Sequence, residues 1–211
     1  MFYRINANNE IIEKLPSYYR GYHADIEPHL DKASDEQKRI YAIPEHEIVE
    51  LSGDVLGSLF TDSGIPRYVA NAGKVEENPK AVKEEAIRDV ITACDKAIWP
   101  LLAKYPASEV LTFPTKRALA YRWIKMSDAE KQNAIRDKEF ALLVTEAAPF
   151  AEVSDIDALV LKIIKNSEQF ENHCALCIRA KKNIINRIME SAGTRKAVDA
   201  IKADMVFPSA E

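Results

Sequence analysis

Glycine is distributed unevenly along this chain, and no other sequence feature constrains the fold as strongly. Five of the six glycines lie within residues 1–79, and only Gly193 lies beyond them. Glycine permits the positive φ angles of tight turns and destabilises helix interiors. Turns should therefore concentrate in the first part, and long helices in the second. We predict an α+β chain, with a small β-containing module over residues 1–79 and an all-α helical bundle over residues 80–211.

Charge divides the chain at the same place. Residues 1–79 contain 8 Lys and Arg against 14 Asp and Glu, a net charge of −6, whereas residues 80–211 contain 21 against 19, a net charge of +2. The total of −4 gives no general attraction to nucleic acid or to an anionic membrane. No apolar run approaches the roughly 20 residues of a membrane span. We therefore expect neither nucleic acid nor a membrane as a partner. Three cysteines make no disulfide framework and favour a reducing compartment.

The first module begins with a predicted hairpin. Two β-prone runs, residues 2–6 and 10–15, flank an Asn-Asn pair, and asparagine tolerates the positive φ of a tight turn. Ser34 and Gln37 fit a capping box that starts a short helix. Between these elements three tyrosines cluster around Gly21, either as a loop packed on the hairpin or as an exposed aromatic patch. They are the candidate partner-binding residues: Tyr18, Tyr19 and Tyr22.

The second module contains apolar residues at helical spacing. Capping boxes at Ser127 and Ser154 predict two helix starts, and Gly193 predicts a left-handed helix end. Pro100 is expected to kink or end the first helix. Short connections indicate antiparallel neighbours in a bundle. The expected helices cover residues 81–102, 111–124, 127–147, a segment from 154, a segment over 170–188, and 194–205.

Two groups of residues suggest metal or redox chemistry. His173-Cys174-x-x-Cys177 could bind zinc or exchange disulfides, but a closed zinc site needs four ligands and these thiols fall within an apolar helical stripe. We interpret them as core residues. The second group is acidic and histidine-rich, and we interpret it as solvated loops. It comprises His23, Asp25, Glu27 and His29, with His46 as a further candidate.

Other patterns favour no catalytic chemistry. The glycines never reach the spacing of a phosphate-binding loop, and the sequence contains no serine nucleophile elbow. Basic residues gather near the C-terminus but are flanked by acidic ones, which favours a solvated helix face over a nucleic-acid surface. We predict no enzyme, no cofactor and no metal. The basic residues are Arg179, Lys181, Lys182, Arg187, Arg195 and Lys196.

Three segments in order give the chain a family resemblance. Glu84–Lys104 is rich in alanine and charge, Tyr105–Pro114 is similar to a recurring Tyr-Pro-x-x-Glu-x-x-Thr/Ser-Trp segment, and Asp155–Ile201 is a helical run with a basic stretch. Over residues 80–203 the chain resembles the C-terminal portion of phage tail-fibre assembly proteins, which are chaperones encoded beside tail fibres. Phe113 replaces the usual tryptophan, and Lys116 and Leu119 replace a glutamine and a glutamate.

The resemblance implies a phage tail-fibre protein as partner and no catalytic residues. The chain would bind the distal end of a trimeric fibre in the host bacterial cytoplasm during assembly, through the first module with its hairpin and its three tyrosines. The alternatives are a structural component of the tail fibre or baseplate that is retained in the virion tail, and a small helical metal-dependent hydrolase. The sequence makes no prediction of the oligomeric state.

Overall fold

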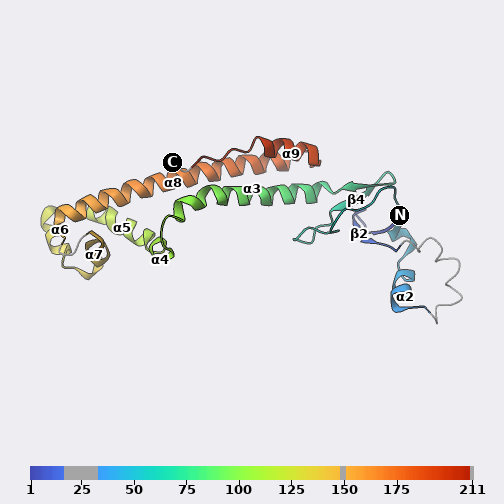
Figure 1. Ribbon diagram of the computed structural model, residues 1–211, viewed down its shortest axis with the longest axis horizontal. Helices are drawn as coiled ribbons and strands as arrows, with labels where there is room; N and C mark the ends of the chain where they lie inside the picture. The colour runs from blue at the N-terminus through green and yellow to red at the C-terminus, as the bar shows by residue number, and fades with distance from the viewer. Residues whose placement is uncertain (17–32, 148–150, 210–211) are drawn as a thin grey trace. The chain divides into compact units, whose positions relative to one another are not determined.

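The computed structural model describes residues 1–16, 33–147 and 151–209 (Figure 1). The fold is α+β, with a small β-containing N-terminal part and a C-terminal helical bundle, which confirms the predicted class. The chain forms two compact units, Met1–Val90 with Asn183–Met205, and Ile91–Lys182 with Val206–Glu211. The boundary at residue 79 lies inside the first unit, and separate folding of the two predicted modules stays a prediction. No helix in the described ranges is long and apolar enough to cross a membrane.

The first unit begins with the predicted hairpin. Strands β1 (Phe2–Ile5) and β2 (Ile11–Lys14) pair antiparallel, with a bulge near Ile5. Asn9 adopts a φ of 59° in the turn, the conformation for which asparagine was expected there. Strand β3 (Ile48–Glu50) pairs with the other side of β1, giving the sheet order β2-β1-β3.

A second hairpin connects the two edge strands of this sheet. Strands β4 (Tyr68–Asn71) and β5 (Lys74–Glu77) pair antiparallel. An isolated bridge joins Val69 to Glu10 before β2, and another joins Lys74 to Ser52 after β3. The two bridges join the second hairpin to both sides of the three-stranded sheet. This arrangement surrounds a core whose buried members are Tyr3, Ile5, Ile11 and Leu51.

A short helix packs beside the first sheet. Helix α2 (Asp35–Tyr41) starts at the predicted capping box, in which the Ser34 hydroxyl accepts the Gln37 N–H and the Gln37 side chain accepts the Ser34 N–H. The one-turn helix η3 (Glu45–Glu47) then leads into β3. A small core forms from the buried residues Leu15, Ile40 and Ile43.

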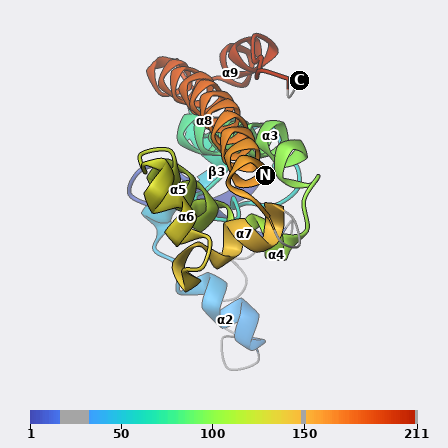
Figure 2. The same cartoon turned by 90° about the vertical axis from the view of Figure 1, so that its left-hand side faces the viewer.

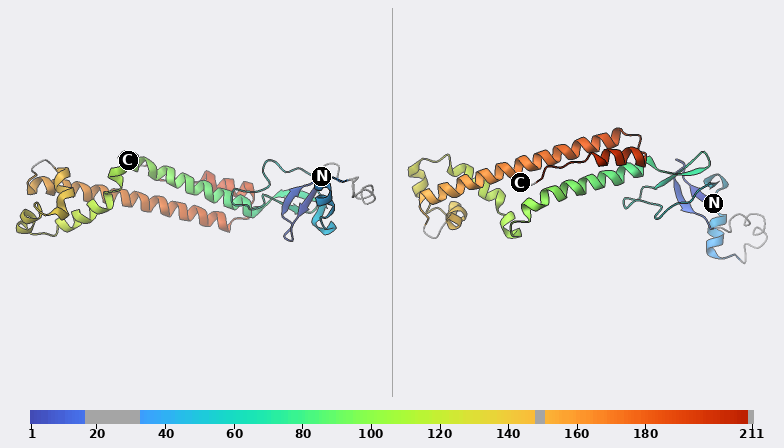
Figure 3. Two further views of the ribbon diagram at one scale, coloured as in Figure 1. Left: turned by 90° about the horizontal axis from the view of Figure 1, so that it is seen from below. Right: turned by 45° about the horizontal axis from the view of Figure 1, so that its top comes forward.

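The ends of two long helices and the whole of a short one complete the first unit. Helix α3 (Pro79–Leu102) begins in this unit, helix α8 (Val153–Glu190) ends in it, and helix α9 (Arg195–Ala203) lies beside the end of α8 (Figure 3). The Lys83 ammonium donates to the Met189 carbonyl at 2.8 Å. Each helix contributes buried apolar side chains in this unit: Ala81, Val82, Ala86, Val90, Ile184, Ile188 and Val198.

The second unit is helical in its described residues. The short helix α4 (Ala107–Val110) follows the end of α3 (Figure 1). Helices α5 (Phe113–Trp123), α6 (Asp128–Ala134) and α7 (Ala141–Ala147), with the one-turn helix η4 (Lys138–Phe140), cluster around the start of α8 (Figure 2). Their core centres on the buried Trp123 and Phe140, whose ring centroids are 5.7 Å apart. The indole N–H of Trp123 donates to Asp157 at 2.7 Å, which satisfies its buried polar atom.

Three of the predicted helix boundaries are wrong. Ser154 does not cap a helix, because α8 begins at Val153 and Ser154 lies inside it. The expected helix over residues 127–147 is broken, because the Asp137 carboxylate accepts the Glu139 N–H and starts a new turn that buries Phe140. The two helices expected between residues 154 and 188 are one 38-residue helix, α8. No glycine or proline interrupts that stretch, so the backbone hydrogen bonding continues. Pro100 lies inside α3, two residues before its end.

Among the glycines of the described residues, Gly193 should tolerate substitution least. Its φ is +73°, and an added Cβ would lie 2.7 Å from the Pro79 Cβ and 3.0 Å from the Pro79 carbonyl oxygen. Gly64 has a similar φ of +79° but open space around it, which makes it a matched control. We expect Gly64→Ala to cost about 1 kcal/mol of unfolding free energy from backbone strain alone, and Gly193→Ala to cost about 1–3 kcal/mol more. Urea denaturation of both variants checks this, and equal losses would contradict it.

Candidate partner-binding surface

The three predicted partner-binding tyrosines, Tyr18, Tyr19 and Tyr22, lie outside the described residues. The four candidate metal-binding residues between His23 and His29 also lie outside them. Within the described ranges, no group of three or more His, Cys, Asp or Glu side chains is placed to hold a metal ion. The clearest candidate surface in the first unit is instead the loop of residues 52–60, between β3 and β4.

Asp54 fixes the start of this loop. Its carboxylate accepts the Tyr3 hydroxyl at 2.9 Å and the Lys14 ammonium at 2.7 and 2.9 Å, and it also accepts the Val55 N–H at 2.8 Å. Tyr3 is fully buried in the core shared by the two sheets, and Lys14 ends β2. One aspartate therefore ties the loop to two strands of the hairpin.

The electrostatics of this contact follow from its geometry. Hydrogen bonds from Lys14 and then Tyr3 hold the pKa of Asp54 below its ordinary value. Burial, followed by the hydrogen bond to Asp54 and its negative charge, raises the pKa of Tyr3 to about 12. Both shifts favour the observed pair, a neutral phenol and an ionised carboxylate.

Tyr68 holds the tip of the loop. Its hydroxyl donates to the Leu56 carbonyl at 2.5 Å and accepts the Leu56 N–H at 3.1 Å. Gly53 and Gly57 bracket the tip with φ angles of +98° and +77°. The Leu56 side chain nevertheless remains 80% exposed. The main chain at this residue is thus fixed, while its apolar side chain is presented to solvent.

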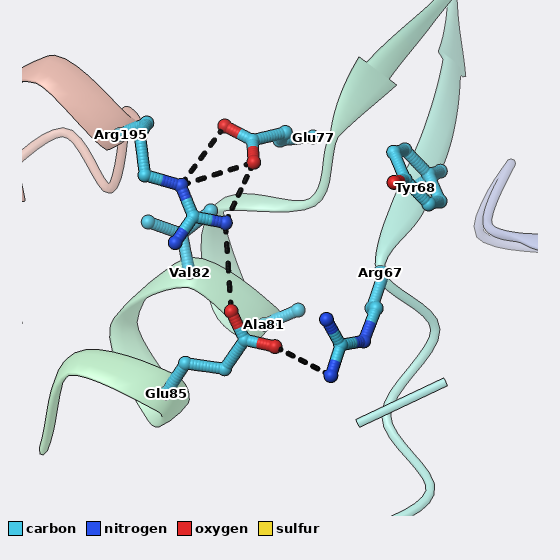
Figure 4. A pocket seen from close by; sticks show the side chains of 7 residues that line it. All are labelled: Arg67, Tyr68, Glu77, Ala81, Val82, Glu85 and Arg195. Carbon is cyan, nitrogen blue, oxygen red and sulfur yellow. Dashed lines mark hydrogen bonds and ion pairs between the residues drawn. The ribbon is translucent and has the colours of Figure 1, made fainter. Parts of the chain in front are cut away.

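The hairpin formed by β4 and β5 is held to α3 and α9 by a chain of ion pairs (Figure 4). Arg195 pairs with Glu77 at 2.6 Å and with Glu85 at 3.4 Å, and Glu85 pairs with Arg67 at 3.0 Å. The hollow beside these residues has a volume of about 20 Å³, room for about one water molecule. We therefore interpret this cluster as a structural clamp that supports β4, the strand that supplies Tyr68.

The clamp also accounts for part of the basic cluster near the C-terminus. Arg195 is engaged with Glu77 and Glu85, and Arg187 pairs with Asp204 at 2.7 Å. These pairs join helices of the first unit to one another and to β5. That the remaining residues of this cluster form a solvated face, as expected from the sequence, stays a prediction.

The thiols lie in the second unit. Cys94 and Cys177 are buried and Cys174 is half-buried. The His173 Nε2 lies 3.3 Å from the Ala97 carbonyl oxygen and 3.5 Å from the Cys177 Sγ. Burial is the main reason that the pKa of each thiol is raised, which disfavours the reactive thiolate. These surroundings agree with the interpretation of Cys174 and Cys177 as packing residues.

Comparisons of the chain with protein-family models, with curated proteins and with solved structures found no match.

Replacing Tyr3 with phenylalanine should alter the pH dependence of stability. At neutral pH the loss of the hydroxyl should cost about 1–2 kcal/mol, because Asp54 loses a hydrogen bond. Above pH 10 the unfolded chain releases the phenolic proton, whereas the folded chain retains it up to about pH 12. Ionisation therefore favours the unfolded wild type, and the phenylalanine variant lacks this effect.

The advantage of the wild type over Tyr3→Phe should accordingly shrink by about 1 kcal/mol between pH 9 and pH 11. Urea unfolding of both proteins at each pH in this range gives the difference between their unfolding free energies. Groups other than Tyr3 titrate in both proteins, so their contributions cancel in this difference. A constant difference would mean that Tyr3 ionises alike in both states.

Proposed function

We propose that this protein is a tail-fibre assembly chaperone that binds the distal end of a trimeric phage tail fibre through its first module, residues 1–79. The resemblance over residues 80–203 supports the class. The observation that best supports a binding role for the first unit is Leu56, which is 80% exposed on a loop held by Asp54 and Tyr68. An exposed apolar side chain on a fixed main chain lowers the free energy of binding when a partner covers it.

The physics of fibre folding explains why such a partner is useful. Trimeric β-rich fibres depend on contacts distant in sequence, so they fold slowly and expose apolar surface and unpaired strands meanwhile. A chaperone binds that surface most effectively if its own binding loop already has the conformation needed for binding. A loop already anchored at its start and at its tip loses little conformational entropy on binding, so more of the contact energy remains available.

The loop and the three tyrosines belong to the same module of the sequence. Residues 1–79 hold Tyr18, Tyr19 and Tyr22 as well as Leu56, together with a net charge of −6. Phe60, near the end of the loop, is 37% exposed and adds an aromatic side chain. Aromatic and aliphatic anchors surrounded by polar groups are the composition of protein-binding surfaces. We therefore assign fibre binding to this module.

Co-expression with the fibre protein encoded by the neighbouring gene tests this function. We expect soluble trimeric fibre with the wild type, and strongly reduced yields with Leu56→Glu and with a Tyr18/Tyr19/Tyr22 triple alanine variant. Leu161→Glu is the matched control, because Leu161 is also exposed, at 65%, but lies on α8 in the second unit. Size-exclusion chromatography measures the trimer, and circular dichroism confirms that each variant is folded.

Full fibre rescue by both Leu56→Glu and the tyrosine variant would exclude the first module as the binding surface. Failure of the wild type to raise the trimer yield would contradict the chaperone function itself. Mass spectrometry of mature particles then separates the chaperone from the alternative, a structural virion component, because only the latter is retained in stoichiometric amount.

A further inference from the structure

The second unit contains a groove that the proposed function does not use. It lies among α4, α5 and α7, is widely open to solvent and has a volume of about 350 Å³, enough to receive a single side chain. Pro106, Glu109 and Thr112, three positions of the Tyr-Pro-x-x-Glu-x-x-Thr/Ser segment, line one part of it. Lys116, Leu142 and Glu146 line the remainder.

Lys116 is the internal cation of the groove. Its side chain is only 9% exposed, and its ammonium lies 2.6 Å from a Glu146 carboxylate oxygen and 3.8 Å from a Glu109 carboxylate oxygen. A lysine buried to this extent needs a charged partner, because an unpaired ammonium is costly to desolvate. The close contact to Glu146 satisfies this need, and the longer contact to Glu109 is weaker.

The charges in the groove do not balance. Two carboxylates face one ammonium, which leaves a single negative charge in excess. The Glu109 and Glu146 side chains are 36% and 33% exposed, so both reach the opening of the groove. Apolar walls at Pro106 and Leu142 stand beside these carboxylates. The excess negative charge suits a cationic head, and the apolar walls suit an apolar stem, so the groove is complementary to a side chain that has both.

We propose that this groove binds an arginine side chain on an extended segment of a partner polypeptide. The guanidinium would contact Glu109 and Glu146, and its methylene stem would lie against Pro106 and Leu142. Arginine fits better than lysine, because its planar group can donate to two carboxylate oxygens at once. The proposal does not depend on the partner being a tail fibre.

A short peptide tests the site directly on the full-length protein. The probe is acetyl-Ala-Arg-Ala-amide, titrated into ¹⁵N-labelled protein and followed by NMR. We expect saturable shifts of backbone amides in residues 106–116 and 142–146. The same peptide with citrulline in place of arginine keeps the shape but loses the charge, and it should bind at least about tenfold more weakly, because the loss of a charge-assisted contact costs about 1.4 kcal/mol or more.

Two variants should move the affinity in opposite directions. Glu109→Gln removes the excess charge but keeps the close Lys116–Glu146 pair, so binding should weaken about fivefold, the effect of one nearby charge in a solvated site. Lys116→Gln leaves two carboxylates without their cation, so binding should tighten about fivefold by the same Coulomb argument. Glu152→Gln is the matched control for net charge, because Glu152 is exposed and outside the groove, and it should bind as the wild type.

Three results would each overturn the proposal. They are equal binding of the arginine and citrulline peptides, an unchanged affinity in Glu109→Gln, and the absence of saturable shifts in the groove at 10-fold molar excess and above. A lysine peptide that binds more tightly than the arginine peptide would refute the choice of arginine. If Lys116→Gln is misfolded by circular dichroism, the Glu109→Gln and citrulline results still decide the question.

Discussion

The hydrogen bond from the buried Tyr3 hydroxyl to Asp54 connects the core of the first unit to its candidate binding loop. Tyr3 lies in the central strand of the β2-β1-β3 sheet, and the same carboxylate also accepts Lys14 from the next strand. The position of Leu56 thus depends on the sheet being formed. The second hairpin completes the support, because Tyr68 holds the loop tip while the neighbouring Arg67 pairs with Glu85 on α3. An exposed leucine is ordinarily unremarkable on a protein surface; what distinguishes this one is that several strands and a helix fix its backbone.

Much of the fold could be predicted from local sequence signals. The Asn-Asn turn, the capping boxes at Ser34 and Ser127 and the left-handed Gly193 all occur where their residue types require them. These signals succeed because each interaction lies within a few residues of chain. The two larger errors depend on residues farther apart in the sequence. Phe140 packs into the core around Trp123 and breaks one predicted helix, whereas α8 continues because no residue in the segment stops it. Tertiary packing decides the first case and the absence of a helix-breaking residue the second.

The candidate sites were harder to predict from the sequence than the fold was. Two anchors of the 52–60 loop, Tyr3 and Lys14, lie 51 and 40 positions from Asp54, and the third, Tyr68, lies 12 positions from Leu56. The apolar run of the loop therefore gave no indication of how the loop is held. The bracketing pair Gly53 and Gly57 was the only local signal of a fixed tip. The groove of the second unit is similar, because Glu109 and Lys116 are near in sequence but Glu146 reaches them from α7. The excess charge becomes evident only when the three helices are assembled. Tyr18, Tyr19 and Tyr22 remain a prediction, since they lie outside the described residues.

The central claim is that the first unit touches the fibre through the anchored loop. Site-specific photocrosslinking tests it most directly, with a benzophenone amino acid placed at position 56 and, in a second protein, at position 161 during co-expression with the fibre protein. The account predicts a crosslinked product containing the fibre from position 56 and none from position 161. Productive fibre assembly with no crosslink from position 56, or with a crosslink from position 161 alone, would contradict it.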